Sequence, residues 1–291
     1  MAVIRTRTRT QAMDWSLVLA SQAISTIIQH TEQEGWHLLV EPEDQPRAVA
    51  AIRQFRRENL HWFWRRSEVW PDFHFDTRAW VWCFYLIAVH LVTTTSFPAF
   101  RQAALMDSGR ASAGEWWRIC TAMLLHVDPA HLLANVCFGF VLFGLAMANY
   151  GAGLGLLASY AAGAAGNIAG WAIYPDAYRS MGASGMVMGA LGLMAVHSIA
   201  YWRRQQLHGS RAFKALASGV LLFLLLGLDP NTDVLAHLGG FIAGVLIGGA
   251  LIALPEKAFR NKFVQLMAGI IFVTLVLGTA VIAALRLAHS R

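Results

Sequence analysis

Long apolar stretches alternate with short polar ones over the last three quarters of the chain. A helix needs roughly 20 apolar residues to cross about 30 Å of hydrocarbon, and seven stretches approach or exceed that length without any Asp or Glu. Lipid offers no hydrogen-bond partner to an open backbone, so each stretch should form an α-helix. The pattern predicts helices at 79–97, 131–149, 152–173, 184–201, 212–228, 234–254 and 264–285.

The first 75 residues follow a different pattern. Residues 15–19 and 36–40 are short runs of strand-like composition, whereas 21–30 and 45–59 have helical spacing. This mixture predicts a small α+β domain.

The chain is therefore expected to hold an N-terminal α+β cytosolic domain at 1–75, a core of six transmembrane helices at 76–256, and an extra C-terminal transmembrane helix at 257–291. The expected fold class is an all-α polytopic membrane protein, a six-helix bundle plus a seventh transmembrane helix, preceded by the small domain.

Composition and charge agree with a membrane protein. The chain is 56% hydrophobic and 14% charged, a balance that soluble globular domains do not normally have. Basic residues mark the cytoplasmic side of membrane proteins, and a cytoplasmic N-terminus would put 17 of the 23 Lys and Arg residues on that side. We expect a multi-pass protein of the cell inner membrane with its N-terminus in the cytoplasm, no removable signal peptide, and no nucleic-acid partner.

Two motifs carry candidate chemistry. Ser184 stands between Gly182-Ala183 and Gly185 at the entrance of one predicted helix, where small neighbours expose its hydroxyl, although small residues there also serve helix packing. His237 lies in an apolar stretch, where an ionisable side chain suggests function, although a backbone carbonyl could satisfy it. A glycine stripe follows at Gly240, Gly244 and Gly248, and close packing against the helix of Ser184 would bring a general base to a nucleophile.

A third motif offers hydrogen-bond donors. His131 and Asn135 are four residues apart and share one helix face, so both could stabilise an oxyanion or simply join helices as polar contacts. His126 precedes His131 by five residues with Pro129 between, which is not the spacing of a zinc motif. We expect no metal, and the proposed chemistry requires no cofactor.

Taken together, these motifs resemble the rhomboid family of intramembrane proteases. The resemblance covers residues 79–254 and includes a Glu-x-Trp-Arg signature at Glu115–Arg118, while 264–285 resembles the extra helix of some members. It implies a rhomboid-like bundle in which Ser184 is the nucleophile and His237 the base. It further implies that His131, Asn135 and the Ser184 amide bind the oxyanion, and that Glu115, Arg118 and His126 have structural roles in the first long loop.

The resemblance also implies a function and exposes a departure. The implied function is a serine endopeptidase that cleaves transmembrane or membrane-adjacent segments of membrane-protein substrates in the lipid bilayer, with loop 229–233 covering the site and the helix at 212–228 moving aside. Met188 stands where members often carry a tyrosine against the catalytic imidazole. Asp233, one turn before His237, could cap the helix or orient the imidazole.

Two other classes of protein compete with this interpretation. One is an inactive rhomboid-fold protein that binds membrane clients, although such proteins typically lack the serine or the histidine. The other is a transporter or channel, which the absence of acidic residues from the apolar stretches disfavours. His90 and His197 have no motif around them and are expected to be packing residues.

Overall fold

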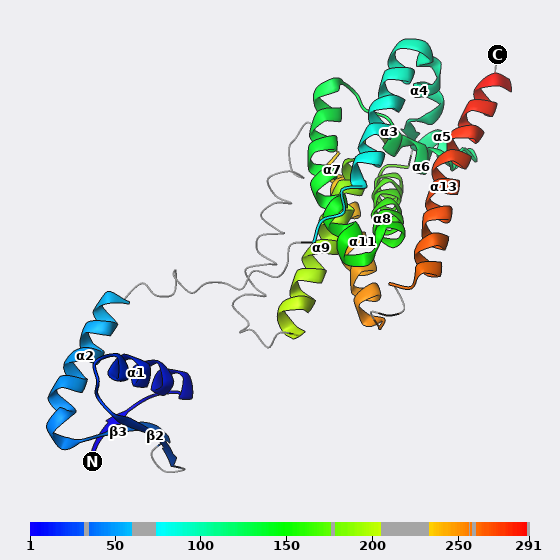
Figure 1. Cartoon of the computed structure of the whole chain (residues 1–291). Coiled ribbons are helices and arrows are strands. Elements are labelled where there is room, and N and C mark those ends of the chain that lie inside the picture. The colour runs from blue at the N-terminus through cyan, green and yellow to red at the C-terminus, as the bar shows by residue number, and fades with distance from the viewer. Residues whose placement is uncertain are drawn as a thin grey trace. The chain divides into compact units, whose positions relative to one another are not determined.

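The computed structural model describes residues 1–31, 35–59, 74–175, 178–204, 233–255, 257 and 260–289. The chain divides into two compact units, Met1–Asp72 and Phe73–Arg291 (Figure 1). The predicted helix at 212–228 and most of the predicted covering loop, 229–232, lie outside the described residues.

The first unit is a three-stranded antiparallel sheet with two helices. The strands lie in the order β1-β3-β2, with Leu38 of the central strand opposite Ile4 and Ile28. Leu38 and Val40 are fully buried with Leu19 and with Ile52, which is 5% exposed. The elements are β1 (Ala2–Arg5), α1 (Arg9–Ser21), β2 (Thr26–Thr31), β3 (Gly35–Val40), a 3-10 turn (Pro42–Asp44) and α2 (Gln45–Glu58).

Two of the four local predictions for this unit are wrong. Residues 15–19 belong to helix α1, because Thr8 caps the helix by accepting a hydrogen bond from the Gln11 amide, and Ala12 and Leu19 reach the core from one helix face. The predicted helix at 21–30 does not form, because α1 ends at Ser21 and β-branched residues from Thr26 pair with β3. Residues 36–40 and 45–59 form β3 and α2 as predicted.

The second unit is mainly helical, and every described apolar stretch forms a helix where the sequence predicted one. Among the described residues, four helices are long and apolar enough to cross a membrane, within Ala79–Ser96, Pro129–Tyr150, Val234–Ala253 and Lys262–His289, and Ser184–Ala200 is a shorter apolar helix. The helices and strands are α3 (Ala79–Leu91), continued by a π-helical turn (Val92–Ser96), α4 (Pro98–Ala104), β4 (Met106–Asp107), α5 (Ser108–Ser112), α6 (Arg118–Thr121), a 3-10 turn (Ala122–Leu124), α7 (Pro129–Tyr150), α8 (Ala152–Ile173), β5 (Arg179–Ser180), α9 (Ser184–Arg204), α11 (Val234–Ala253) and α13 (Lys262–His289).

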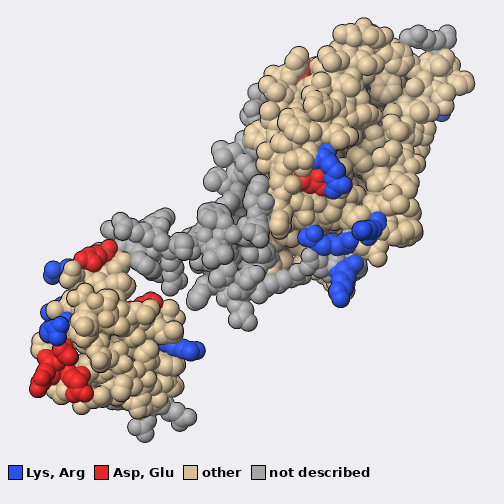
Figure 2. Space-filling view, in the orientation of Figure 1, with Lys and Arg blue, Asp and Glu red and all other residues tan. Residues whose placement is uncertain are grey.

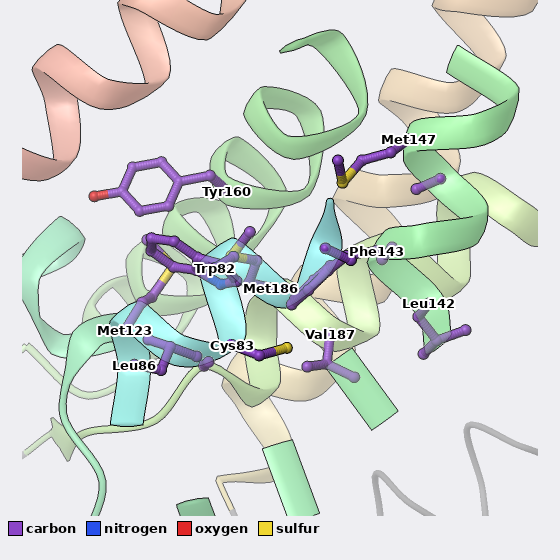
Figure 3. Packing of buried hydrophobic residues seen from close by; sticks show 14 of the residues in the cluster. Trp82, Cys83, Leu86, Met123, Leu142, Phe143, Met147, Tyr160, Met186 and Val187 are labelled. Atoms are coloured by element: carbon purple, nitrogen blue, oxygen red, sulfur yellow. The ribbon is translucent and has the colours of Figure 1, made fainter. Parts of the chain in front are cut away.

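Helices α8, α9 and α11 form the closely packed centre of this unit, and α7 joins α8 and α9 to α3. Figure 3 shows Trp82, Met123, Tyr160 and Met186 meeting in the apolar core. Helix α13 runs along one side of the unit and packs on α8, α4 and α6 (Figure 1). The centre therefore holds the first turns of α9 and α11 against each other.

Candidate active site

Ser184 is the first residue of α9, and Gly182 shapes the chain before it. Gly182 has a φ of +145°, a conformation that side chains other than glycine rarely adopt. A Cβ atom there would lie 2.7 Å from His131 Cε1, 3.0 Å from His131 Nε2 and 3.6 Å from Ser184 Oγ. The imidazole of His131 and the hydroxyl of Ser184 therefore border the same small space.

His237 lies in the first turn of α11 and is 3% exposed. The glycine stripe one turn further on is pressed against α9: a Cβ on Gly240 would lie 2.3 Å from the Gly185 carbonyl oxygen, and one on Gly244 would lie 2.1 Å from that of Gly189. In the other direction, a Cβ on Gly185 would lie 3.4 Å from the Ala236 carbonyl oxygen. The two backbones thus touch beside Ser184 and beside His237.

The start of α7 brings His131 and Asn135 to this region. The Asp128 side chain accepts a hydrogen bond from the His131 amide at 2.8 Å and caps the helix. Asn135 is 5% exposed, and its Nδ2 donates to the His131 carbonyl at 2.9 Å. Because an amide nitrogen carries two hydrogens, one N–H of Asn135 holds the helix while the second can serve another acceptor.

His126 supports the chain next to Ser184. Its ring is fully buried, and its Nε2 accepts a hydrogen bond from the Ala183 amide at 3.4 Å. The His131 ring lies edge-on to it, with ring centroids 5.3 Å apart. Burial, with the nearby His131, His90 and Arg101, lowers the pKa of His126 to about 3. The ring is therefore neutral at physiological pH, as an acceptor of this amide must be.

Glu115 and Arg118 hold the long loop between α3 and α7. The Arg118 side chain is 1% exposed, and its Nε donates to Glu115 Oε2 at 2.6 Å. Its Nη1 donates to the carbonyl oxygens of Gln102 at 2.9 Å and Leu105 at 2.7 Å. This buried guanidinium fastens α4 and the residues after it to α6, some distance along the chain from Ser184.

Asp233 has two partners at the start of α11. Its Oδ1 accepts a hydrogen bond from the Ala236 amide at 2.9 Å, as a helix cap does, and its Oδ2 accepts one from the Tyr178 hydroxyl. Burial, together with the Asp233 charge, raises the pKa of the Tyr178 phenol. The hydrogen bond of Tyr178 was not predicted from the sequence, because a single tyrosine between two helices belongs to no pattern that would indicate it.

Met188 replaces the tyrosine that the family pattern often has after the serine. Met188 lies one turn after Ser184, is 3% exposed and belongs to the apolar core. Among the described residues, no group of three or more His, Cys, Asp and Glu side chains is arranged to hold a metal ion.

The protein is a multi-pass helical membrane protein. Its Ser184 begins α9, with the His131 ring beside it and the His126 ring bonded to the Ala183 amide. The family follows from comparison with known proteins. Residues 113–254 match the model of the Rhomboid domain, so this part of the chain is a rhomboid domain, and it is similar to rhomboid proteases.

Several curated proteins are similar to this chain. It is 31% identical to rhomboid protease GluP of Bacillus subtilis over 177 residues, covering 59% of this chain and 32% of that protein. It is 31% identical to RHOMBOID-like protein 1 of Arabidopsis thaliana, covering 59% of this chain and 44% of that protein. The putative rhomboid protease YdcA of Bacillus subtilis is 27% identical, with 70% of this chain and 98% of that protein covered. The chain thus spans less than half the length of the first two.

Proposed function

We propose that this protein is an intramembrane serine endopeptidase that cleaves transmembrane or membrane-adjacent segments of other membrane proteins. The observation that carries the proposal is the contact pattern around Ser184. A Cβ on Gly182 would meet both the Ser184 hydroxyl and the His131 imidazole, and Gly185 and Gly240 join α9 to α11 within one turn of His237. The match of residues 113–254 to the Rhomboid domain supports the same chemistry.

In the proposed reaction, Ser184 Oγ attacks the peptide carbonyl and His237 accepts the hydroxyl proton. A serine hydroxyl needs such a base because it is a weak nucleophile at its ordinary pKa. His237 then gives the proton to the leaving amine, and an acyl-enzyme forms on Ser184. Water, deprotonated by His237, hydrolyses the acyl-enzyme and regenerates the serine.

The negative charge that develops on the carbonyl oxygen needs donors. The first N–H groups of an α-helix have no partner within the helix, so the amide of Ser184 at the start of α9 suits this role. We assign His131 Nε2 and the second N–H of Asn135 to the same oxyanion. Each such donor contributes about 2.7–4 kcal/mol to transition-state stabilisation in soluble hydrolases.

The test is cleavage of a transmembrane reporter by the purified full-length protein in proteoliposomes. Ser184→Ala and His237→Ala should each reduce cleavage to background, whereas Ser198→Ala, further along the same helix, should cleave like wild type. A fluorophosphonate should label wild type and Ser198→Ala, but not Ser184→Ala. Equal cleavage by wild type and Ser184→Ala would contradict the proposal. Reporter binding by wild type without cleavage or labelling would indicate an inactive client-binding protein instead.

The location within the cell is part of the same proposal. We place the protein in the cell inner membrane with residues 1–75 in the cytoplasm as a separate domain, 76–256 as the protease core, and 257–291 as the extra helix. The excess of Lys and Arg in the N-terminal tail and in the short loops of that side supports this orientation.

A further inference from the structure

Helices α3 and α13 enclose an open seam on the side of the second unit. Helix α13 packs on α8, α4 and α6, while a groove of about 850 Å³ separates much of it from α3. A smaller hollow of about 300 Å³ continues along the same two helices beyond Tyr85, which lines both. The larger groove falls within the range of about 300–1,000 Å³ that small-molecule sites occupy.

The walls of the groove are apolar and firmly held. Val81 and Tyr85 of α3 line it together with Leu266, Ile270 and Leu277 of α13. At one end, Gln265 Nε2 donates to the Tyr150 carbonyl at 2.8 Å, and Gln265 Oε1 accepts from the Leu154 amide at 3.1 Å. Along the floor, the rings of Trp82 and Phe272 meet edge-on with centroids 5.2 Å apart. These contacts hold α13 beside the Gly151 turn and beside α3.

Cationic side chains stand at the end of the groove near the start of α13. Arg78 lines this end, with a side chain 69% exposed, and Asp76 beneath it is 12% exposed and orients the guanidinium through a 2.6 Å ion pair. Lys262 is exposed one turn before Leu266, so it continues the stripe of α13 that lines the groove. Figure 2 shows Lys and Arg side chains on this face of the unit.

We propose that this groove binds an anionic glycerophospholipid, with an acyl chain between α3 and α13 and the phosphate beside Arg78 and Lys262. The apolar walls match the chain, and the cations match the phosphate, which Arg and Lys bind through charge-assisted hydrogen bonds. Basic pockets between transmembrane helices recognise anionic headgroups in this way. Ser184 is not among the residues that line the groove, so this lipid site goes beyond the proposed protease activity.

Two glycines of α13 provide a matched pair of variants that test the acyl-chain position. Gly269 lines the groove, Gly278 does not, both are partly exposed, and a Cβ on either would meet no atom within 4 Å. Native mass spectrometry of the full-length protein, titrated with phosphatidylglycerol, should show one retained lipid on wild type and on Gly278→Phe. Gly269→Phe should lose it, because the new ring occupies the groove.

The charged end is tested with the same measurement. Arg78→Gln and Lys262→Gln should each weaken phosphatidylglycerol binding about fivefold, the change that about 1 kcal/mol per basic residue near an anionic surface corresponds to. Phosphatidylcholine should bind more weakly than phosphatidylglycerol to wild type and should not distinguish these variants. Lys257→Gln removes an equal charge away from the lining residues and should bind like wild type.

Several outcomes would overturn the lipid site. These are equal binding by Gly269→Phe and Gly278→Phe, equal retention of the two lipids by wild type, or a loss with Lys257→Gln as large as with Lys262→Gln. If Gly269→Phe differs from wild type in its oligomeric state or in reporter binding, but still binds the lipid, the groove binds a protein helix instead. Melting curves confirm that each variant is folded. Because the titration also works on Ser184→Ala, its result is separate from that of the cleavage test.

Discussion

Gly182 is the residue on which the geometry beside Ser184 depends most directly. It combines a positive φ with a position where a Cβ would lie 2.7 Å from the His131 ring. Gly114 offers a natural comparison, because its φ is +101° but a Cβ there would meet no atom within 4 Å. Backbone strain acts at both positions, whereas displacement of an imidazole acts only at Gly182.

We therefore expect Gly114→Ala to lose about 1–2 kcal/mol of stability from the left-handed backbone, and Gly182→Ala to lose at least as much. Only Gly182→Ala should also lose reporter cleavage, because His131 must move. We expect its cleavage rate to fall tenfold or more, which corresponds to about 1.4 kcal/mol of activation free energy. Thermal melting and cleavage rates measured on both variants check this. A Gly182→Ala protein that cleaves as well as Gly114→Ala would show that the position of His131 is unimportant.

His126 predicts a dependence of stability on pH. Its pKa in the folded protein is about 3, below the ordinary value of 6.5, so the unfolded chain binds a proton that the folded chain does not. The stability contributed by this site is complete above about pH 6.5 and falls as the pH drops towards 3.

We expect the melting temperature of wild type to fall over that pH interval and His126→Asn to show a smaller fall, although it is less stable at pH 7. Melting curves at a series of pH values measure both effects. An identical acid loss in the two proteins would mean that His126 is not responsible for it.

At the scale of helices, the contact of α9 with α11 decides whether the site forms. Gly244 has the Gly189 carbonyl oxygen 2.1 Å from where a Cβ would be, and backbone cannot turn away as a side chain can. Gly249 lies on the same helix, and a Cβ there would meet no atom within 4 Å.

Gly244→Ala should therefore force the helices apart, with a loss of about 1–3 kcal/mol from overpacking and loss of cleavage. Gly249→Ala should retain the stability and activity of wild type. Unfolding and cleavage assays on the pair test this, and retention of activity by Gly244→Ala would show that the two helices need not touch this closely.

The apolar pattern was sufficient to predict the described membrane helices, because length and the absence of charge leave lipid-facing chain little choice but a helix. It failed at 15–19 and 21–30, where short segments take their structure from a cap at Thr8 and from pairing with β3. Motif spacing placed Ser184 and His237 on helices that prove to touch, and their catalytic roles stay predictions. The Tyr178–Asp233 contact was beyond reach because it joins residues 55 positions apart that share no periodic pattern.

At the scale of the whole molecule, the charge distribution predicts the orientation in the membrane. With the N-terminal tail in the cytoplasm, the region of Lys257 and Lys262 lies on the same side, and the loop that contains Arg118 lies on the other. We expect a single cysteine at position 257 to react with a membrane-impermeant thiol reagent only in inside-out vesicles, in a background whose three native cysteines are replaced. A cysteine at Arg110 should behave in the opposite way, and labelling of both from one side would contradict the orientation.

The two hydrogen bonds of Gln265 span the Gly151 turn that joins α7 to α8. The carbonyl of Tyr150 and the amide of Leu154 are synthesised more than one hundred residues before the glutamine that satisfies them. Until α13 has been synthesised and has packed against α8, these two groups lack the partner that Gln265 provides. A chain that stops before Gln265 therefore cannot close this turn through these two hydrogen bonds.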